Sequence, residues 1–103
     1  MHVRSDDAFD GLPGAEWVRD GLRDLAEGRE TVAALLVAIG APRLRVAGLT
    51  VPEVAFSRPE QGDFPEHRLY LHLAAEDQDS AHSRYNALVR RLVSFERALS
   101  CAR

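Results

Sequence analysis

Apolar residues recur at alternating spacings of four and three along the last two dozen residues of the chain. They are Ala81, Tyr85, Leu88, Leu92, Phe95, Leu99 and Ala102. Such spacings place side chains on one stripe of an α-helix, as in the seam of a coiled coil. We therefore expect a long terminal helix that packs along its whole length against other helices.

Two further helices are expected in the first half of the chain. Residues 15–27 carry an apolar stripe with charged residues on the opposite face, and Gly28 ends that pattern. Residues 30–39 are apolar on nearly every side, which is typical of a helix in the centre of a core or at a subunit interface.

The two strongly apolar helices supply more apolar surface than short neighbouring helices can cover. This surplus favours association of two copies, because contiguous exposed apolar surface marks an interaction site. We therefore expect a homodimer that forms through helical surfaces. The predicted interface residues are Leu88, Leu92, Phe95 and Leu99.

The middle of the chain leaves alternatives open. Residues 42–47 fit either a short helix or a strand with Leu44 and Val46 pointing inward. Residues 67–73 alternate leucine with polar residues, as a strand does. The capping spacing of Asp63 and Glu66, with Pro65 in the first turn, favours a helix there instead.

The fold class that follows is mainly α, a small bundle of three or four helices with an irregular or short-stranded middle. The alternative is an α+β fold with a small antiparallel sheet from residues 44–57 and 67–73. Residues 1–13, which are rich in Asp, Gly and Pro, are expected to form a flexible N-terminal tail. Residues 14–103 then form a single globular domain.

Composition sets the broad class of the protein. All 13 basic residues are arginine, which indicates the codon bias of a GC-rich bacterium. The longest apolar run is about half of what a bilayer requires, so no membrane partner is expected. The single cysteine, Cys101, excludes an internal disulfide and suits the cytoplasm, and we expect it to act as a small apolar filler.

Charge is segregated toward the C-terminus. Residues 60–79 hold six acidic residues against one arginine, and residues 80–103 hold five arginines against one glutamate. We expect the acidic segment to cover the basic helix. The four arginines that flank the apolar stripe, Arg84, Arg90, Arg91 and Arg97, are the candidates for anion binding.

Nucleic-acid binding is an alternative that depends on residues 32–49. An apolar helix, a turn at Gly40 and the apolar residues Val46 and Leu49 resemble a weak helix-turn-helix, with Arg43 and Arg45 as its basic contacts. A net charge of −3 opposes a general attraction to nucleic acid, so this partner is not expected.

Catalytic signatures are weak. His72 and Glu76 lie four residues apart, and His82 follows Asp77 and Asp79, but the spacing matches no established metal motif. We assign no catalytic residue, no metal ligand and no cofactor. The sequence therefore predicts a non-catalytic interaction or regulatory module, with a nucleic-acid-binding regulator second and a small metal-dependent or acid/base enzyme third.

Overall fold

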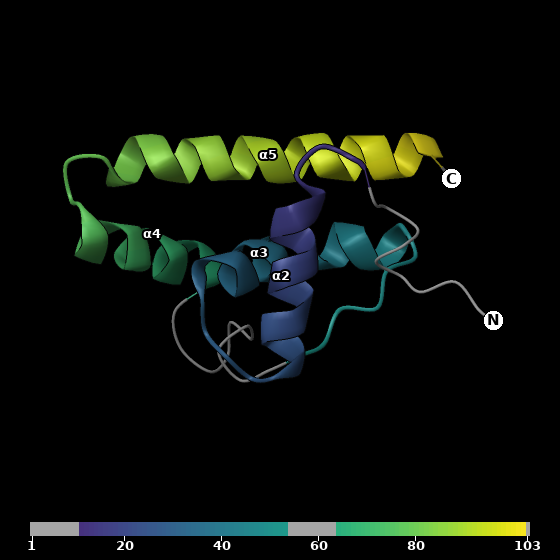
Figure 1. Cartoon of the computed structure of the whole chain (residues 1–103), viewed down its shortest axis with the longest axis horizontal. Coiled ribbons are helices and arrows are strands. Elements are labelled where there is room, and N and C mark those ends of the chain that lie inside the picture. The colour runs from purple at the N-terminus through teal and green to yellow at the C-terminus, as the bar shows by residue number, and fades with distance from the viewer. Residues whose placement is uncertain (1–10, 54–63, 103) are drawn as a thin grey trace.

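The computed structural model describes residues 11–53 and 64–102, and in these two ranges the chain forms four helices. They are α2 (Ala15–Ala26), α3 (Val32–Val46), α4 (Pro65–Glu76) and α5 (Ala81–Ala102). α5 lies along the long axis of the molecule, α4 runs back beside its N-terminal half, and α2 crosses α3 (Figure 1). The prediction of a mainly α-helical bundle is confirmed.

The alternative α+β fold is wrong where it falls on described residues. Residues 44–46 end α3, residues 47–53 form no strand, and residues 67–73 lie within α4. Residues 54–57 of the predicted sheet lie outside the described residues, as do residues 1–10 of the predicted N-terminal tail. No helix in the described part of the chain has the length and apolar character needed to cross a bilayer.

α2 crosses α3 closely because a glycine lies at the contact. A Cβ atom built on Gly21 would lie 2.3 Å from the carbonyl oxygen of Ala33 and 2.3 Å from Cγ2 of Val37. Only a residue without a side chain allows two helix backbones to approach this far. The crossing buries Val18 and Leu25 of α2 against the middle of α3.

α3 is longer than the sequence predicts. The hydroxyl oxygen of Thr31 accepts a hydrogen bond from the backbone N–H of Ala34 at 3.0 Å, and so caps the helix at its start. The predicted end at residue 39 is wrong, because the helix continues through Gly40 and Pro42. The continuation buries Leu44 completely, and a proline ring near the last turn removes only one backbone hydrogen bond.

α4 confirms the prediction of a helix over residues 67–73. Pro65 occupies its first turn, where a missing N–H leaves no hydrogen bond unmade. Leu69 and Leu73, one helical turn apart, are fully buried, whereas Leu71 is about half exposed on the other side. The strand-like alternation of leucines is therefore distributed over two faces of a helix.

The apolar stripe of α5 packs into the core of this same chain. Phe95 and Leu99 join a cluster with residues of α2 and α3, and Leu88 and Leu92 join a second cluster with residues of α3 and α4. All four side chains are buried. Packing along the helix agrees with the sequence, while an interface between subunits at these residues stays a prediction, as does the single domain over residues 14–103.

Candidate functional site

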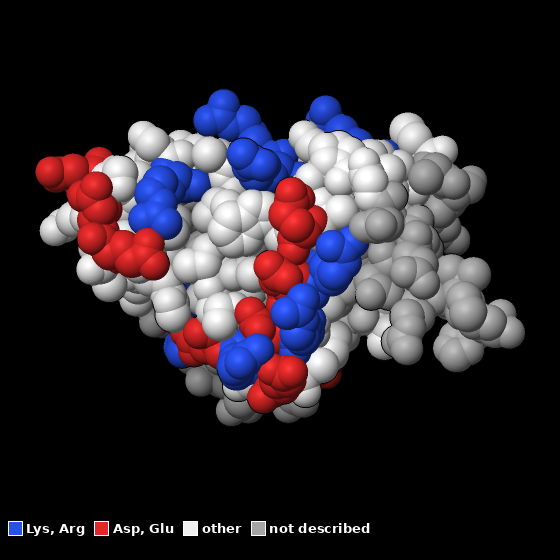
Figure 2. Space-filling model, viewed as in Figure 1, with Lys and Arg blue, Asp and Glu red and all other residues white. Residues whose placement is uncertain are grey.

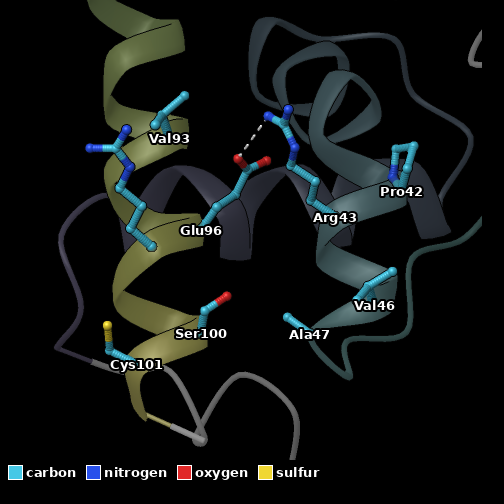
Figure 3. A pocket seen from close by; sticks show the side chains of 9 residues that line it. Pro42, Arg43, Val46, Ala47, Val93, Glu96, Ser100 and Cys101 are labelled. Carbon is cyan, nitrogen blue, oxygen red and sulfur yellow. Dashed lines mark ion pairs between the residues drawn. The ribbon is translucent and has the colours of Figure 1, made fainter.

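A groove lies on the surface between the C-terminal halves of α3 and α5 (Figure 3). Its volume is about 840 Å³, and its residues recur at helical spacing on each wall. The residues that line it are Pro42, Arg43, Val46, Ala47, Val93, Glu96, Arg97, Ser100 and Cys101. We call this feature the α3–α5 groove.

The α3–α5 groove combines apolar walls with charged edges. Val46 leaves 81% of its surface exposed, the largest exposed fraction among the described large apolar side chains. The alternative of a strand over residues 42–47 with Val46 pointing inward is therefore wrong, because Val46 is the exposed last residue of α3. Arg43 from α3 and Arg97 from α5 carry positive charge at the groove, and both are exposed.

Glu96 is the one charged residue that is buried in the described part of the chain. Its side chain is 10% exposed and points from α5 toward α3, where Nη1 of Arg43 lies 3.6 Å from its Oε1 atom (Figure 3). Its Oε2 atom is buried and has no hydrogen-bond partner. A buried carboxylate oxygen without a partner is energetically unfavourable, because it loses water and gains nothing in return.

The position of Glu96 depends on Gly40. A Cβ atom built on Gly40 would lie 2.6 Å from Oε2 of Glu96 and 2.9 Å from Cδ1 of Leu92. Gly40 thus does not stop α3 but leaves the space into which the carboxyl group fits. Burial raises the pKa of Glu96 above its ordinary value, and the weaker attraction of Arg43 lowers it only in part.

A second charged cluster lies at the other end of α3 and is fully paired. Glu30 accepts hydrogen bonds from Arg68 of α4, including one from Nε at 3.0 Å, and lies 3.0 Å from Nε2 of His72. The hydrogen bond from Arg68 holds the pKa of Glu30 below its ordinary value, and His72 adds to this effect against the opposing effect of burial. This cluster joins α4 to the start of α3.

The four arginines predicted to bind anions do not meet at one place. Arg84 pairs with Glu76 at 2.8 Å, and Nε of Arg90 donates to the backbone oxygen of Asn86 at 3.4 Å. Arg91 and Arg97 are exposed. Figure 2 shows acidic side chains over the turn between α4 and α5 and arginines along α5. Within residues 64–79, the described part of the acidic segment, Glu76 pairs with Arg84, whereas Arg90, Arg91 and Arg97 are exposed; residues 60–63 lie outside the described residues.

The predicted helix-turn-helix is absent from residues 32–49. Such a motif needs two helices joined by a turn, whereas one helix runs from Val32 to Val46. Arg45, one of its expected basic contacts, donates a hydrogen bond to the carbonyl oxygen of Val51 at 2.8 Å. The nucleic-acid alternative thus loses the element on which it rested.

His72 and His82, the two histidines singled out from the sequence, do not come together in one site. His72, on α4, lies against Glu30. On α5, the ring of His82 lies 3.3 Å from the amide nitrogen of Asn86. Within residues 11–53 and 64–102, no three His, Cys, Asp or Glu side chains are placed to hold a metal ion. The expectation that Cys101 is an apolar filler is wrong, because its thiol is exposed at the groove.

Glu96 was missed by sequence reasoning, which read it as a lone acid on a basic helix. A signal for it exists in the spacing. Glu96 lies one turn after Leu92 and directly after Phe95, at the edge of the apolar stripe, and Gly40 interrupts an otherwise apolar segment. Neither observation alone predicts that these two residues meet across two helices.

The chain matches no protein-family model, no curated protein and no solved structure, so the site must be interpreted from its own geometry.

Proposed function

We propose that the protein is a non-catalytic interaction module whose α3–α5 groove holds a helix of a partner protein. The observation that carries this proposal is the exposure of Val46 on the wall of a hollow of about 840 Å³ with largely apolar walls. Exposed apolar surface that lines a groove is typical of sites that bind a partner. The bacterial origin and cytoplasmic location expected from composition belong to the same proposal.

The walls of the groove favour a helix over an extended segment as the occupant. Both walls are helices, whose backbone groups are already hydrogen-bonded within each helix. An extended segment gains affinity by pairing with a free strand edge, and residues 11–53 and 64–102 contain no strand. A helix satisfies its own backbone and can place a stripe of apolar side chains into the groove.

Homodimer formation through this groove is the alternative occupant. In a two-fold symmetric interface the same surface of each copy faces the other. Arg43 and Arg97 of both copies would then come together, and the only acid that lines the described groove, Glu96, is buried. This like-charge arrangement favours a different protein over a second copy as the partner.

The proposal is tested with a synthetic amphipathic helical peptide that carries leucines at spacings of three and four and glutamates on the flanking positions. We expect amide NMR shifts of the labelled protein to change at the α3–α5 groove. Val46→Asp should abolish binding, because an ionised carboxylate is unfavourable in an apolar contact. Leu71→Asp, a change at an exposed apolar residue of α4, is the matched control and should bind normally.

Two results would overturn the proposal. One is a peptide that does not bind or that shifts residues elsewhere. The other is a Val46→Asp variant that binds like the parent protein. Sedimentation of the parent protein alone tests the alternative occupant, because a dimer that Val46→Asp dissociates would assign the groove to a second copy.

A further inference from the structure

Arg43 is held loosely at the α3–α5 groove. The shortest distance in its ion pair with Glu96 is 3.6 Å, longer than a good charged hydrogen bond. The side chain of Arg43 is 77% exposed, whereas that of Glu96 is 10% exposed. An arginine in this position can turn toward solvent, but the carboxyl group between the two helices cannot follow it.

The edges of the groove favour an acidic partner. Arg43 and Arg97 are both exposed there, on opposite walls, and Glu96 is the only acidic residue that lines the described groove. Guanidinium groups at an apolar contact pair well with carboxylates on the flanks of a bound helix.

We infer that the partner helix is acidic and that its carboxylate takes Arg43 away from Glu96, so that docking is coupled to uptake of a proton by Glu96. This inference rests on the proposed function of the groove. Once Arg43 turns outward, a charged Glu96 would be left buried with no cation beside it. Protonation removes that unfavourable charge.

The charged and titratable groups around Glu96 support this coupling. From α3, Arg43 is the cation whose attraction acts on the carboxyl group, and Gly40 contributes only backbone. From α5, Arg97, Ser100 and Cys101 line the same groove. Burial already raises the pKa of Glu96 with Arg43 in place, so loss of Arg43 raises it further.

The coupling has a definite sign. Lower pH neutralises Glu96, frees Arg43 and strengthens docking, whereas higher pH lets an ionised Glu96 compete with the partner for Arg43. The glutamates of an exposed peptide remain ionised at pH values well above their ordinary pKa of 4.5. Between about pH 5.5 and about pH 8, the change in affinity therefore reports on the protein rather than on the peptide.

The experiment measures the Kd of the acidic peptide at both pH values for the parent protein and for Glu96→Gln. A second peptide, with glutamine in place of every glutamate, is the matched control ligand. We expect the parent protein to bind the acidic peptide roughly five-fold or more tightly at the lower pH, a typical size for coupling between two sites. Glu96→Gln should bind it tightly at both pH values, because its neutral amide leaves Arg43 free.

The results separate this inference from the proposed function. The inference is overturned if the parent protein and Glu96→Gln show the same pH dependence, or if both peptides bind with equal affinity. In either case, binding that maps to the α3–α5 groove still supports the proposed function. If neither peptide binds, both proposals fail. Thermal melting of Glu96→Gln shows whether the variant is folded.

Discussion

Glu30 and Glu96 lie at opposite ends of α3 and differ in their hydrogen-bond partners and in the direction in which their pKa is shifted. Glu30, directly before α3, is paired with Arg68 and His72, and these contacts lower its pKa. Glu96, on α5 beside the end of α3, has one long contact with Arg43 and one oxygen with no partner, and burial raises its pKa. The first carboxylate stabilises the fold, and the second is kept at a cost to it.

The difference follows from where α4 lies. α4 packs against the N-terminal part of α3 and of α5, so it supplies both Arg68 and His72 to Glu30. α2 packs against the C-terminal halves of α3 and α5 from one side, but no described residue of α2 or α4 lines the α3–α5 groove, which remains open. Natural proteins retain unsatisfied buried charges at functional sites more readily than elsewhere. This contrast is the reason for assigning function to the open end.

The comparison requires that the core be equally well packed at both ends. Phe95 at the open end and Leu73 at the end covered by α4 are both fully buried. Phe95→Ala should lower the free energy of unfolding by about 3–5 kcal/mol and Leu73→Ala by about 2–5 kcal/mol, through lost burial and a residual cavity. Urea unfolding monitored by circular dichroism measures both.

Arg90→Ala is the control for these two variants, since Arg90 is exposed on α5 and its change should alter the free energy of unfolding by less than about 0.5 kcal/mol. A small effect of Phe95→Ala beside a large effect of Leu73→Ala would mean that the open end is loosely packed. The groove would then be a gap left by poor packing and not a binding surface on a well-packed core.

Two helix glycines, Gly21 and Gly40, allow the same comparison to be made at single contacts between helices. At Gly21 a methyl group meets the backbone of Ala33, which cannot move aside, so Gly21→Ala should lower the free energy of unfolding by about 1–3 kcal/mol. At Gly40 it meets the ends of the Glu96 and Leu92 side chains, which can move. Gly40→Ala should therefore lower the free energy of unfolding less than Gly21→Ala, since the gain in helix propensity of roughly 1 kcal/mol is common to both positions.

Thermal melting of the two alanine variants ranks these effects. Equal losses would show that Glu96 is as fixed in position as a backbone carbonyl. That outcome would contradict the expectation that the side chains of Glu96 and Leu92 can adjust to a methyl group at residue 40.

Much of the fold is readable in the sequence because periodicity is a local property. The stripe of Leu88, Leu92, Phe95 and Leu99 predicted the longest helix, and capping residues predicted α4 despite its alternating leucines. The end of α3 was placed incorrectly because Gly40 and Pro42 are ordinary stop signals. Gly40 stands within α3 because of tertiary packing, since its missing side chain makes room for α5. The helix continues past Gly40 because Leu44 is buried.

The candidate site was less predictable, since it depends on contacts between distant residues. Arg43 was singled out for a DNA-binding motif and Arg97 for anion binding, but no local pattern brings them to one groove. Glu30 lies 38 residues from Arg68, and only the packing of α4 on α3 brings them together. A buried carboxylate at the edge of an apolar stripe cannot be told from a solvated one without that packing.

The most direct test of the contrast is the free energy of unfolding of the parent protein, Glu30→Gln and Glu96→Gln as a function of pH. Because the pKa of Glu30 is lowered, its contribution should be present at neutral pH, where Glu30→Gln should lose about 1 kcal/mol. That difference should fade as pH falls below the ordinary value of 4.5 and through the lowered pKa of Glu30.

Glu96 should give the opposite sign in the same measurement. Because its pKa is raised, ionised Glu96 destabilises the folded state, and stability is lost as pH rises from the ordinary value of 4.5 through the raised pKa. Glu96→Gln should therefore be at least as stable as the parent protein at neutral pH and equal to it in acid. If Glu96→Gln instead loses as much stability at neutral pH as Glu30→Gln, both carboxylates stabilise the fold and the central contrast is wrong.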